Sequence, residues 1–238
     1  MNIKSFFEII SQSWWKLKFD KTHQSAYKNV NCLKIMALVL LILLIVCAIV
    51  ATVILVNKTK AIESCEGVCL GNHRVYSKDD WGGKPPVSSV PLSAPIELVI
   101  ISHSATTPCD SFETCSAMVR SFQEWHFEIN LTDIGYNFII GGDAGIYVGR
   151  GWDVRNFHRQ GSLGINFIGD FNFDQLNSSM IDAAKLLVKE GLKLGKLSEQ
   201  YLLVGHNQTT TRLPLSPGEI AYREIKTLPF KWAMTVPI

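Results

Sequence analysis

Serine and histidine side chains offer the first route to chemistry in this chain, because a hydroxyl beside an imidazole base can act as a nucleophile. Ser102 and His103 are neighbours in the apolar run VIISHSAT. Neighbouring residues of a strand point to opposite faces, so these two side chains should be splayed apart. Gly161-Ser162 lacks the G-x-S-x-G pattern of a hydrolase nucleophile turn. The spacing therefore does not predict a serine hydrolase.

A metal site is the second route, because imidazole is a common zinc ligand. A catalytic zinc ion takes three His, Cys or carboxylate ligands and a water molecule whose pKa falls to about 7. An unconventional cluster of four of the six histidines stays open at this point: His103, His126, His158 and His206. Nucleic-acid binding is not predicted, since the net charge is only +2 and no basic block is interleaved with aromatic residues.

The elements that position these residues follow from the spacing of apolar side chains. Ile96–Ile101 is a continuous apolar run, as expected for a central strand. Asp110 followed by Glu113, and Ser179 followed by Asp182, predict the starts of two helices. Further strands are expected at 136–140, 145–148, 165–168 and 201–204, and a last helix at 219–227. Strands alternating with helices predict an α/β fold with helices packed on a sheet.

An uncharged segment at 35–56 predicts a membrane anchor. Its length as a helix, about 33 Å, spans a hydrocarbon core of roughly 30 Å. Six lysines precede it, and a Lys/Arg excess stays cytoplasmic. We therefore expect a cytoplasmic tail at 1–34, a transmembrane helix at 35–56, a stalk at 57–72 and a folded domain at 73–238. The protein would be a single-pass, type II protein of the cell membrane with its C-terminal domain outside the cell.

Cysteines and glycosylation motifs agree with an extracellular domain. Cys65, Cys69, Cys109 and Cys115 fall on the predicted outer side, an even number that suits disulfides in an oxidising compartment. Cys109 and Cys115 are close in sequence and are expected to pair, and Cys65 with Cys69 is a further possible pair. The N-x-S/T acceptor pattern occurs at Asn57, Asn130, Asn177 and Asn207. The pattern predicts a glycoprotein.

Eight sequence strings, in order between Trp81 and Trp232, resemble the peptidoglycan-recognition protein family, relatives of phage and bacterial zinc amidases. The strings are WG at 81–82, VIISHSAT at 99–106, QEWH at 123–126, DIGYNFIIGGD at 133–143, IYVGRGW at 146–152, SLGINFIGDF at 162–171, LLVGHNQ at 202–208 and SPG at 216–218. The N-terminal anchor resembles that of the long, membrane-bound insect members. The resemblance implies a mixed central sheet flanked by helices, and a groove for a muropeptide, the sugar and stem peptide of the bacterial wall.

In active relatives, zinc in this groove cleaves the bond between muramic acid and L-alanine. The resemblance assigns the ligand positions to Ser102, His206 and Ser216, where active members have His, His and Cys. A neutral hydroxyl is a poor zinc ligand beside imidazole or thiolate, and the stretch from His206 to Pro217 is longer than usual. We therefore expect no bound zinc or other cofactor and no catalysis, although Tyr136 keeps the place of the family's catalytic-site tyrosine.

The groove could still bind its ligand without cutting it. The matching groove positions are His103, Ser104, His126, Tyr136, Trp152, His158 and His206. Their polar tips and aromatic faces suit hydrogen bonding to amide groups and stacking on a sugar. Three differences act against binding. Asn130-Leu131-Thr132 replaces a dipeptide that carries an aromatic side chain, a Tyr-Asn pair between Trp152 and Ser162 is lost, and a glycan on Asn130 would lie on the groove wall.

These patterns together predict a membrane-anchored, non-catalytic peptidoglycan-recognition protein that acts as an innate immune receptor or regulator. It would bind bacterial peptidoglycan or muropeptide, or pair with a related receptor. Two alternatives stay open. One is an active zinc N-acetylmuramoyl-L-alanine amidase on the cell surface, and the other is a co-receptor or decoy that binds another protein and no wall ligand.

Overall fold

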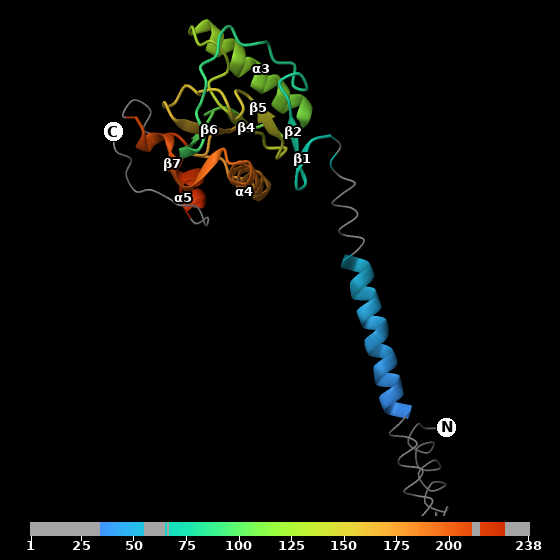
Figure 1. Cartoon of the computed structure of the whole chain (residues 1–238). Coiled ribbons are helices and arrows are strands. Elements are labelled where there is room, and N and C mark those ends of the chain that lie inside the picture. Colours follow the sequence, from blue (N-terminus) through green and yellow to red (C-terminus); the bar gives the residue numbers. More distant parts are fainter. Residues whose placement is uncertain (1–33, 55–64, 66, 211–214, 227–238) are drawn as a thin grey trace, which may run out of the picture. The chain divides into compact units, whose positions relative to one another are not determined.

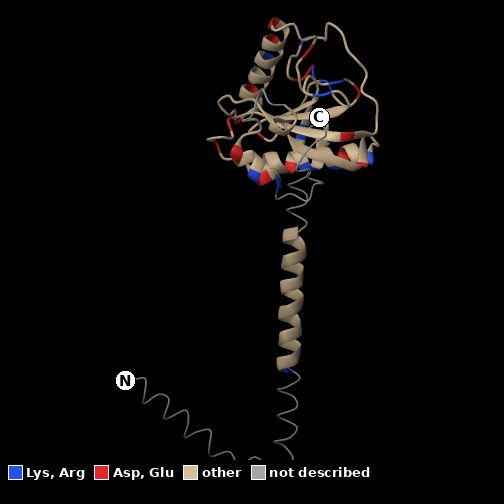
Figure 2. Cartoon of the chain, turned by 90° about the vertical axis from the view of Figure 1, so that its left-hand side faces the viewer, with Lys and Arg blue, Asp and Glu red and all other residues tan. Residues whose placement is uncertain are grey.

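The computed structural model describes residues 34–54, 65, 67–210 and 215–226. The chain divides into two compact units, residues 1–60 and 61–238. The first contains the helix Lys34–Ile54, which is long and apolar enough to cross a membrane, with a mean hydropathy of 3.4 in its most apolar window. In Figure 2 this helix is tan beyond its first residue, Lys34, because it contains no further acidic or basic residue. Residues 1–33 of the predicted tail, the end of the predicted span and most of the predicted stalk lie outside the described residues.

The second unit is built on a seven-stranded mixed sheet with the order β1-β2-β5-β4-β6-β3-β7. The strands are β1 Cys69–Leu70, β2 His73–Tyr76, β3 Ile96–His103, β4 Phe138–Ile140, β5 Ile146–Val148, β6 Ser162–Phe167 and β7 Leu197–Gly205. β3 pairs in parallel with β6 and β7, whereas β1–β2 and β4–β5 are antiparallel. The predicted mixed α/β fold is confirmed.

The sheet begins earlier in the chain than predicted. β1 pairs with β2, with Cys69 opposite Arg74, and a disulfide joins Cys65 to Cys69. The last residues of the segment expected to be a stalk, 57–72, thus form a hairpin at the edge of the sheet. Neither strand has the long apolar run that marks the central strand β3, so apolarity did not reveal this hairpin.

Helices cover both faces of the sheet (Figure 1). They are α3 Phe112–Glu128, α4 Ser178–Lys193 and α5 Glu219–Lys226, with a short 3-10 helix η1 at His206–Gln208. Side-chain alternation decides which face each strand residue joins. Ile101 and Ile165 pack into the core beneath α4 and α5, whereas Ile139 packs with Val119 of α3.

Two predicted helix starts and several strand ends need correction. α3 is capped by Ser111, not Asp110. The Ser111 hydroxyl accepts the Thr114 N–H, and the Thr114 hydroxyl accepts the Ser111 N–H. α4 starts after Asn177, whose side-chain oxygen accepts the Ser179 N–H at 2.8 Å. β4 starts later than predicted, and β6 and β7 start earlier, because pairing with neighbouring strands rather than apolarity sets where a strand ends.

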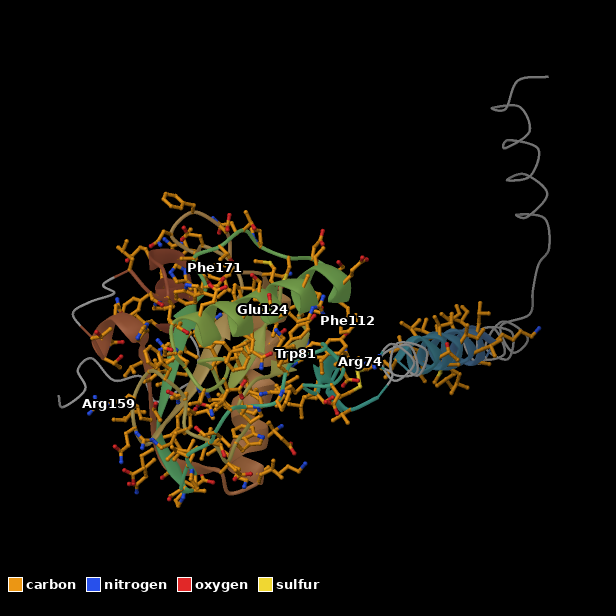
Figure 3. The ribbon with its side chains drawn as sticks, turned by 90° about the horizontal axis from the view of Figure 1, so that it is seen from above. Arg74, Trp81, Phe112, Glu124, Arg159 and Phe171 are labelled. Atoms are coloured by element: carbon orange, nitrogen blue, oxygen red, sulfur yellow. A yellow bond between two sulfur atoms is a disulfide. The ribbon has the colours of Figure 1, made fainter. Side chains whose placement is uncertain are left out.

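Trp81 holds α3 on its face of the sheet. Its buried indole donates a hydrogen bond to the Val148 carbonyl at 2.9 Å, and its own carbonyl accepts one from the Arg120 guanidinium at 2.7 Å. At the start of α3, the Phe112 ring lies 4.5 Å from the Tyr76 ring of β2. Figure 3 labels Trp81 and Phe112 in this region. α3 is therefore fixed at several points along its length.

The predicted Cys109–Cys115 disulfide is present and joins the loop before α3 to the first turns of the helix. We expect the double variant C109S/C115S to lose about 2 kcal/mol of unfolding free energy, because breaking a short covalent loop frees the unfolded chain. Urea denaturation of residues 61–238, with and without the substitutions, measures this loss. An unchanged unfolding midpoint would contradict the prediction.

Candidate functional site

Four of the predicted groove residues form a row of rings, which we call the ring row. His126 comes from α3, Tyr136 from the loop before β4, His158 from the loop before β6, and His206 from η1. Successive ring centroids lie 5.3, 5.5 and 4.2 Å apart along this order. Residues from four separate parts of the sequence thus form one continuous series of ring contacts.

Ser102 of β3 lies against the ring row. Its hydroxyl donates to the Asn166 side-chain oxygen at 2.9 Å and lies 3.2 Å from His158 Nε2. Since a hydroxyl has a single proton, and this one is used on Asn166, His158 Nε2 must be the donor in the second bond. Ser102 is also only 1% exposed. In this hydrogen-bond arrangement the imidazole does not serve as a base for the hydroxyl, and the hydroxyl is buried.

The ring row is electrically neutral near pH 7. Burial lowers the pKa of His158 to about 3, and charge repulsion from His206 and His126 lowers it in the same direction. Burial also lowers the pKa of His126 to about 4 and lowers that of His206. The pKa of Tyr136 rises to about 12, again through burial. The row therefore offers uncharged hydrogen-bonding groups and aromatic faces, which suit a ligand rich in amides and hydroxyls.

His103 points away from Ser102, as expected for neighbours on a strand. Its Nδ1 accepts a hydrogen bond from the Phe171 N–H at 3.2 Å, and the Asp170 carboxylate lies 3.8 Å away. The His103 backbone N–H donates to the Ser216 hydroxyl at 3.3 Å. Burial lowers the pKa of His103. Its ring packs 6.2 Å from that of Phe171, which Figure 3 labels. His103 is thus outside the ring row.

The other two predicted groove residues also lie outside the row. The Ser104 hydroxyl accepts the Gly169 N–H at 3.0 Å and bonds the Thr106 hydroxyl at 2.7 Å, so it ties two loops together. Trp152 packs elsewhere in the fold. Its ring lies 4.6 Å from Phe138 and packs onto α4, in the core on the opposite face of the sheet from Ser102.

Buried asparagines that the sequence analysis missed hold the loop of His158. The Asn156 side chain donates to Asn137 at 2.9 Å and to the Ser162 carbonyl at 2.6 Å, and it accepts the His158 N–H at 2.8 Å. Asn137 in turn donates to the carbonyls of residues 151 and 154. The sequence offered one signal for them: Asn137 is a polar residue inside the apolar run YNFII. An amide buried in such a strand must be hydrogen-bonded to other parts of the fold.

A buried ion pair fixes the loop that carries Tyr136. The Asp133 carboxylate is 5% exposed and pairs with the Lys78 ammonium. Its second oxygen accepts a hydrogen bond from the Gln123 side chain of α3 at 2.8 Å. The loop that carries Tyr136 is therefore anchored to α3, three residues along the helix from His126.

The three positions of the zinc site do not fit zinc in this chain. The hydroxyls of Ser102 and Ser216 are neutral, poor ligands, and both already form hydrogen bonds within the fold. His206 supplies the single imidazole. Within the described residues, no group of three or more His, Cys, Asp or Glu side chains is placed to hold a metal ion. Of the four histidines in the alternative cluster, three belong to the ring row and His103 lies outside it.

The folded domain is similar to proteins of a known family. Residues 92–219 match the N-acetylmuramoyl-L-alanine amidase family, Amidase_2. A peptidoglycan recognition protein of Trichoplusia ni is 38% identical over 161 residues, which cover 66% of this chain and 87% of the relative.

Two solved structures are similar across the same domain. One is the complex of tracheal cytotoxin with the ectodomains of peptidoglycan recognition proteins LCa and LCx, with 40% identity and a TM-score of 0.64 over 67% of this chain and 98% of that chain. The other is a mutant of Drosophila PGRP-LB in complex with tracheal cytotoxin, with 36% identity and a TM-score of 0.64 over 67% of this chain and 96% of that chain. The chain therefore belongs to the peptidoglycan recognition protein family.

Proposed function

We propose that this chain is a membrane-anchored, non-catalytic peptidoglycan recognition protein that binds muropeptide at the ring row. The observation that carries the proposal is the state of the two hydroxyls at the zinc positions. Ser102 and Ser216 replace ligands and take part in hydrogen bonds to Asn166 and to the His103 backbone. Without a metal to activate water, the site retains surfaces for binding and lacks the means for cutting.

The ring row supports the binding half of the proposal. The Tyr136 hydroxyl forms no hydrogen bond within the part of the chain that the structure describes, and so it can bond to a ligand. The two related structures that contain tracheal cytotoxin support a muropeptide as that ligand. One of them joins two recognition proteins, which supports pairing with a related receptor as a second mode of action.

The helix Lys34–Ile54 supports the membrane anchor. The lysines that precede it support a cytoplasmic N-terminus and a recognition domain outside the cell. Both disulfides, Cys65–Cys69 and Cys109–Cys115, belong to the unit that would face the oxidising compartment. This topology makes the protein a single-pass, type II surface receptor or regulator.

Residues 61–238 are expected to purify without stoichiometric zinc and to leave peptidoglycan uncut, while binding tracheal cytotoxin in calorimetry. Y136F should weaken this binding about five-fold, the loss of one hydrogen bond worth about 1 kcal/mol. F173A, at an exposed ring that is not part of the row, is the matched control and should bind normally. Stoichiometric zinc with wall cleavage would support an amidase instead, and absence of binding heat would support a co-receptor without a wall ligand.

A further inference from the structure

Three of the four N-x-S/T acceptors lie within the described residues, and their environments differ. Asn130 is exposed, in the turn that follows α3. Its backbone adopts a left-handed conformation, with φ at 63°, which asparagine tolerates well. The Asn130 N–H donates to the Phe127 carbonyl at 3.0 Å, whereas the side-chain amide bonds to nothing in the described residues. The amide of Asn130 is thus free to carry a substituent.

The other two acceptors use their side chains within the fold. Asn177 caps α4: its oxygen accepts the Ser179 N–H at 2.8 Å, and its nitrogen donates to the Gly142 carbonyl at 3.4 Å. A sugar on that nitrogen would compete with the second bond. Asn207 is partly buried, and its side-chain oxygen is fully buried. A sugar on the Asn207 nitrogen would stand next to this buried oxygen, within η1.

We infer that Asn130 carries an N-linked glycan. The inference rests on the proposed extracellular location of the domain. In the modification, Asn130 Nδ2 bonds to the anomeric carbon of a lipid pyrophosphate-linked oligosaccharide, the bond from that carbon to the pyrophosphate breaks, and the nitrogen loses a proton. Thr132 supplies the hydroxyl of the acceptor pattern, and no hydrogen bond of that hydroxyl to the described residues competes for it.

The glycan would cover an apolar part of the surface next to the ring row. Trp125 and Ile129, at the end of α3, are 55% and 43% exposed. The Trp125 ring lies 5.0 Å from that of His126, the first member of the row. The Leu131 N–H donates to the His126 carbonyl at 2.8 Å, so the residue after Asn130 contacts the same helical turn. Sugar rings stack well on aromatic faces, so the first sugars have an apolar surface beside their attachment point.

The test uses the full-length chain expressed in insect cells and treated with a peptide N-glycosidase, which converts each glycosylated asparagine to aspartate. Peptide mass spectrometry should show this conversion at Asn130 and not at Asn177 or Asn207. On a denaturing gel, removal of one glycan by the glycosidase shifts the band by one step. T132A should lack this shift, whereas T132S, which keeps the acceptor hydroxyl, should show it. Neither substitution touches the left-handed residue, so the folded state is preserved. N177Q and N207Q should each show the same gel shift as the parent protein.

V87N creates a separate acceptor, N-S-S, at a side chain that is 79% exposed, and reports whether the domain enters the secretory pathway. Glycan on V87N with none on Asn130 would overturn the inference and leave the proposed topology standing. Modification at Asn177 or Asn207 in place of Asn130 would do the same. Absence of glycan from every acceptor, including V87N, would overturn the extracellular topology and the inference with it.

Discussion

Replacing Asp133 with alanine is expected to lower the unfolding free energy by about 3–5 kcal/mol, because it leaves the ammonium partner without its counter-charge in a low-dielectric site. The lost partners are Lys78 and the Gln123 side chain, and Asp133 is 5% exposed. Three elements meet here: the loop after β2, helix α3 and the loop that carries Tyr136. Urea denaturation of residues 61–238 measures the loss.

An exposed ion pair provides the matched control. Lys84 and Glu124 lie 3.3 Å apart, with side chains 64% and 59% exposed, and Figure 3 labels Glu124. E124A should cost no more than about 0.5 kcal/mol, since solvent screens such pairs. The double variant D133A/K78M should be more stable than D133A alone, because it removes the stranded charge. Equal costs for D133A and E124A would show that the buried pair does not support the fold.

Acidification from pH 7.5 to pH 5 is expected to remove about 4 kcal/mol of unfolding free energy through two buried histidines, about 2 kcal/mol each. The folded-state pKa values of His126 and His158 are about 4 and about 3, below the ordinary value of 6.5. A lowered histidine pKa means that the unfolded chain binds protons first. Stability is therefore fully present above pH 6.5 and is lost progressively as the pH falls toward the folded values.

The range above pH 5 separates this effect from carboxyl groups, which titrate near pH 4. Burial also lowers the pKa values of His103 and His206, and their contributions have the same sign. H126N removes one titrating group while its side-chain oxygen can still accept the Gly135 N–H that His126 accepts at 3.2 Å. Between the two pH values this variant should lose about 2 kcal/mol less stability than the parent protein. A pH dependence equal to that of the parent protein would refute the role of His126.

Local patterns in the sequence were enough to predict the mixed α/β fold, the paired cysteines Cys109 and Cys115, and the family. These features depend on neighbours in the chain or on strings such as DIGYNFIIGGD. The residues that cap the helices could not be predicted from these local patterns. Ser111 and Thr114 compete with Asp110 as capping groups, and only the path of the backbone decides which side chain reaches the free N–H groups.

The edge hairpin at Cys69–Leu70 was missed for a related reason. A two-residue strand has no periodicity, and its pairing with β2 becomes visible only once the sheet exists. The asparagines that hold the loop of His158 were missed because the sequence does not say which polar residues are buried. Asn137 and Asn156 are buried by contacts between segments far apart in the chain.

By itself, the sequence determined which chemical groups stand at the key positions: hydroxyls at Ser102 and Ser216 where metal ligands would be required, and an acceptor pattern at Asn130. The tertiary structure decided what those groups contact. It brings His126, Tyr136, His158 and His206 into one neutral row and places Trp152 on the opposite face. The physical reason is that residue identity is local, whereas burial, proton position and pKa depend on neighbours that only the folded sheet and its helices bring together.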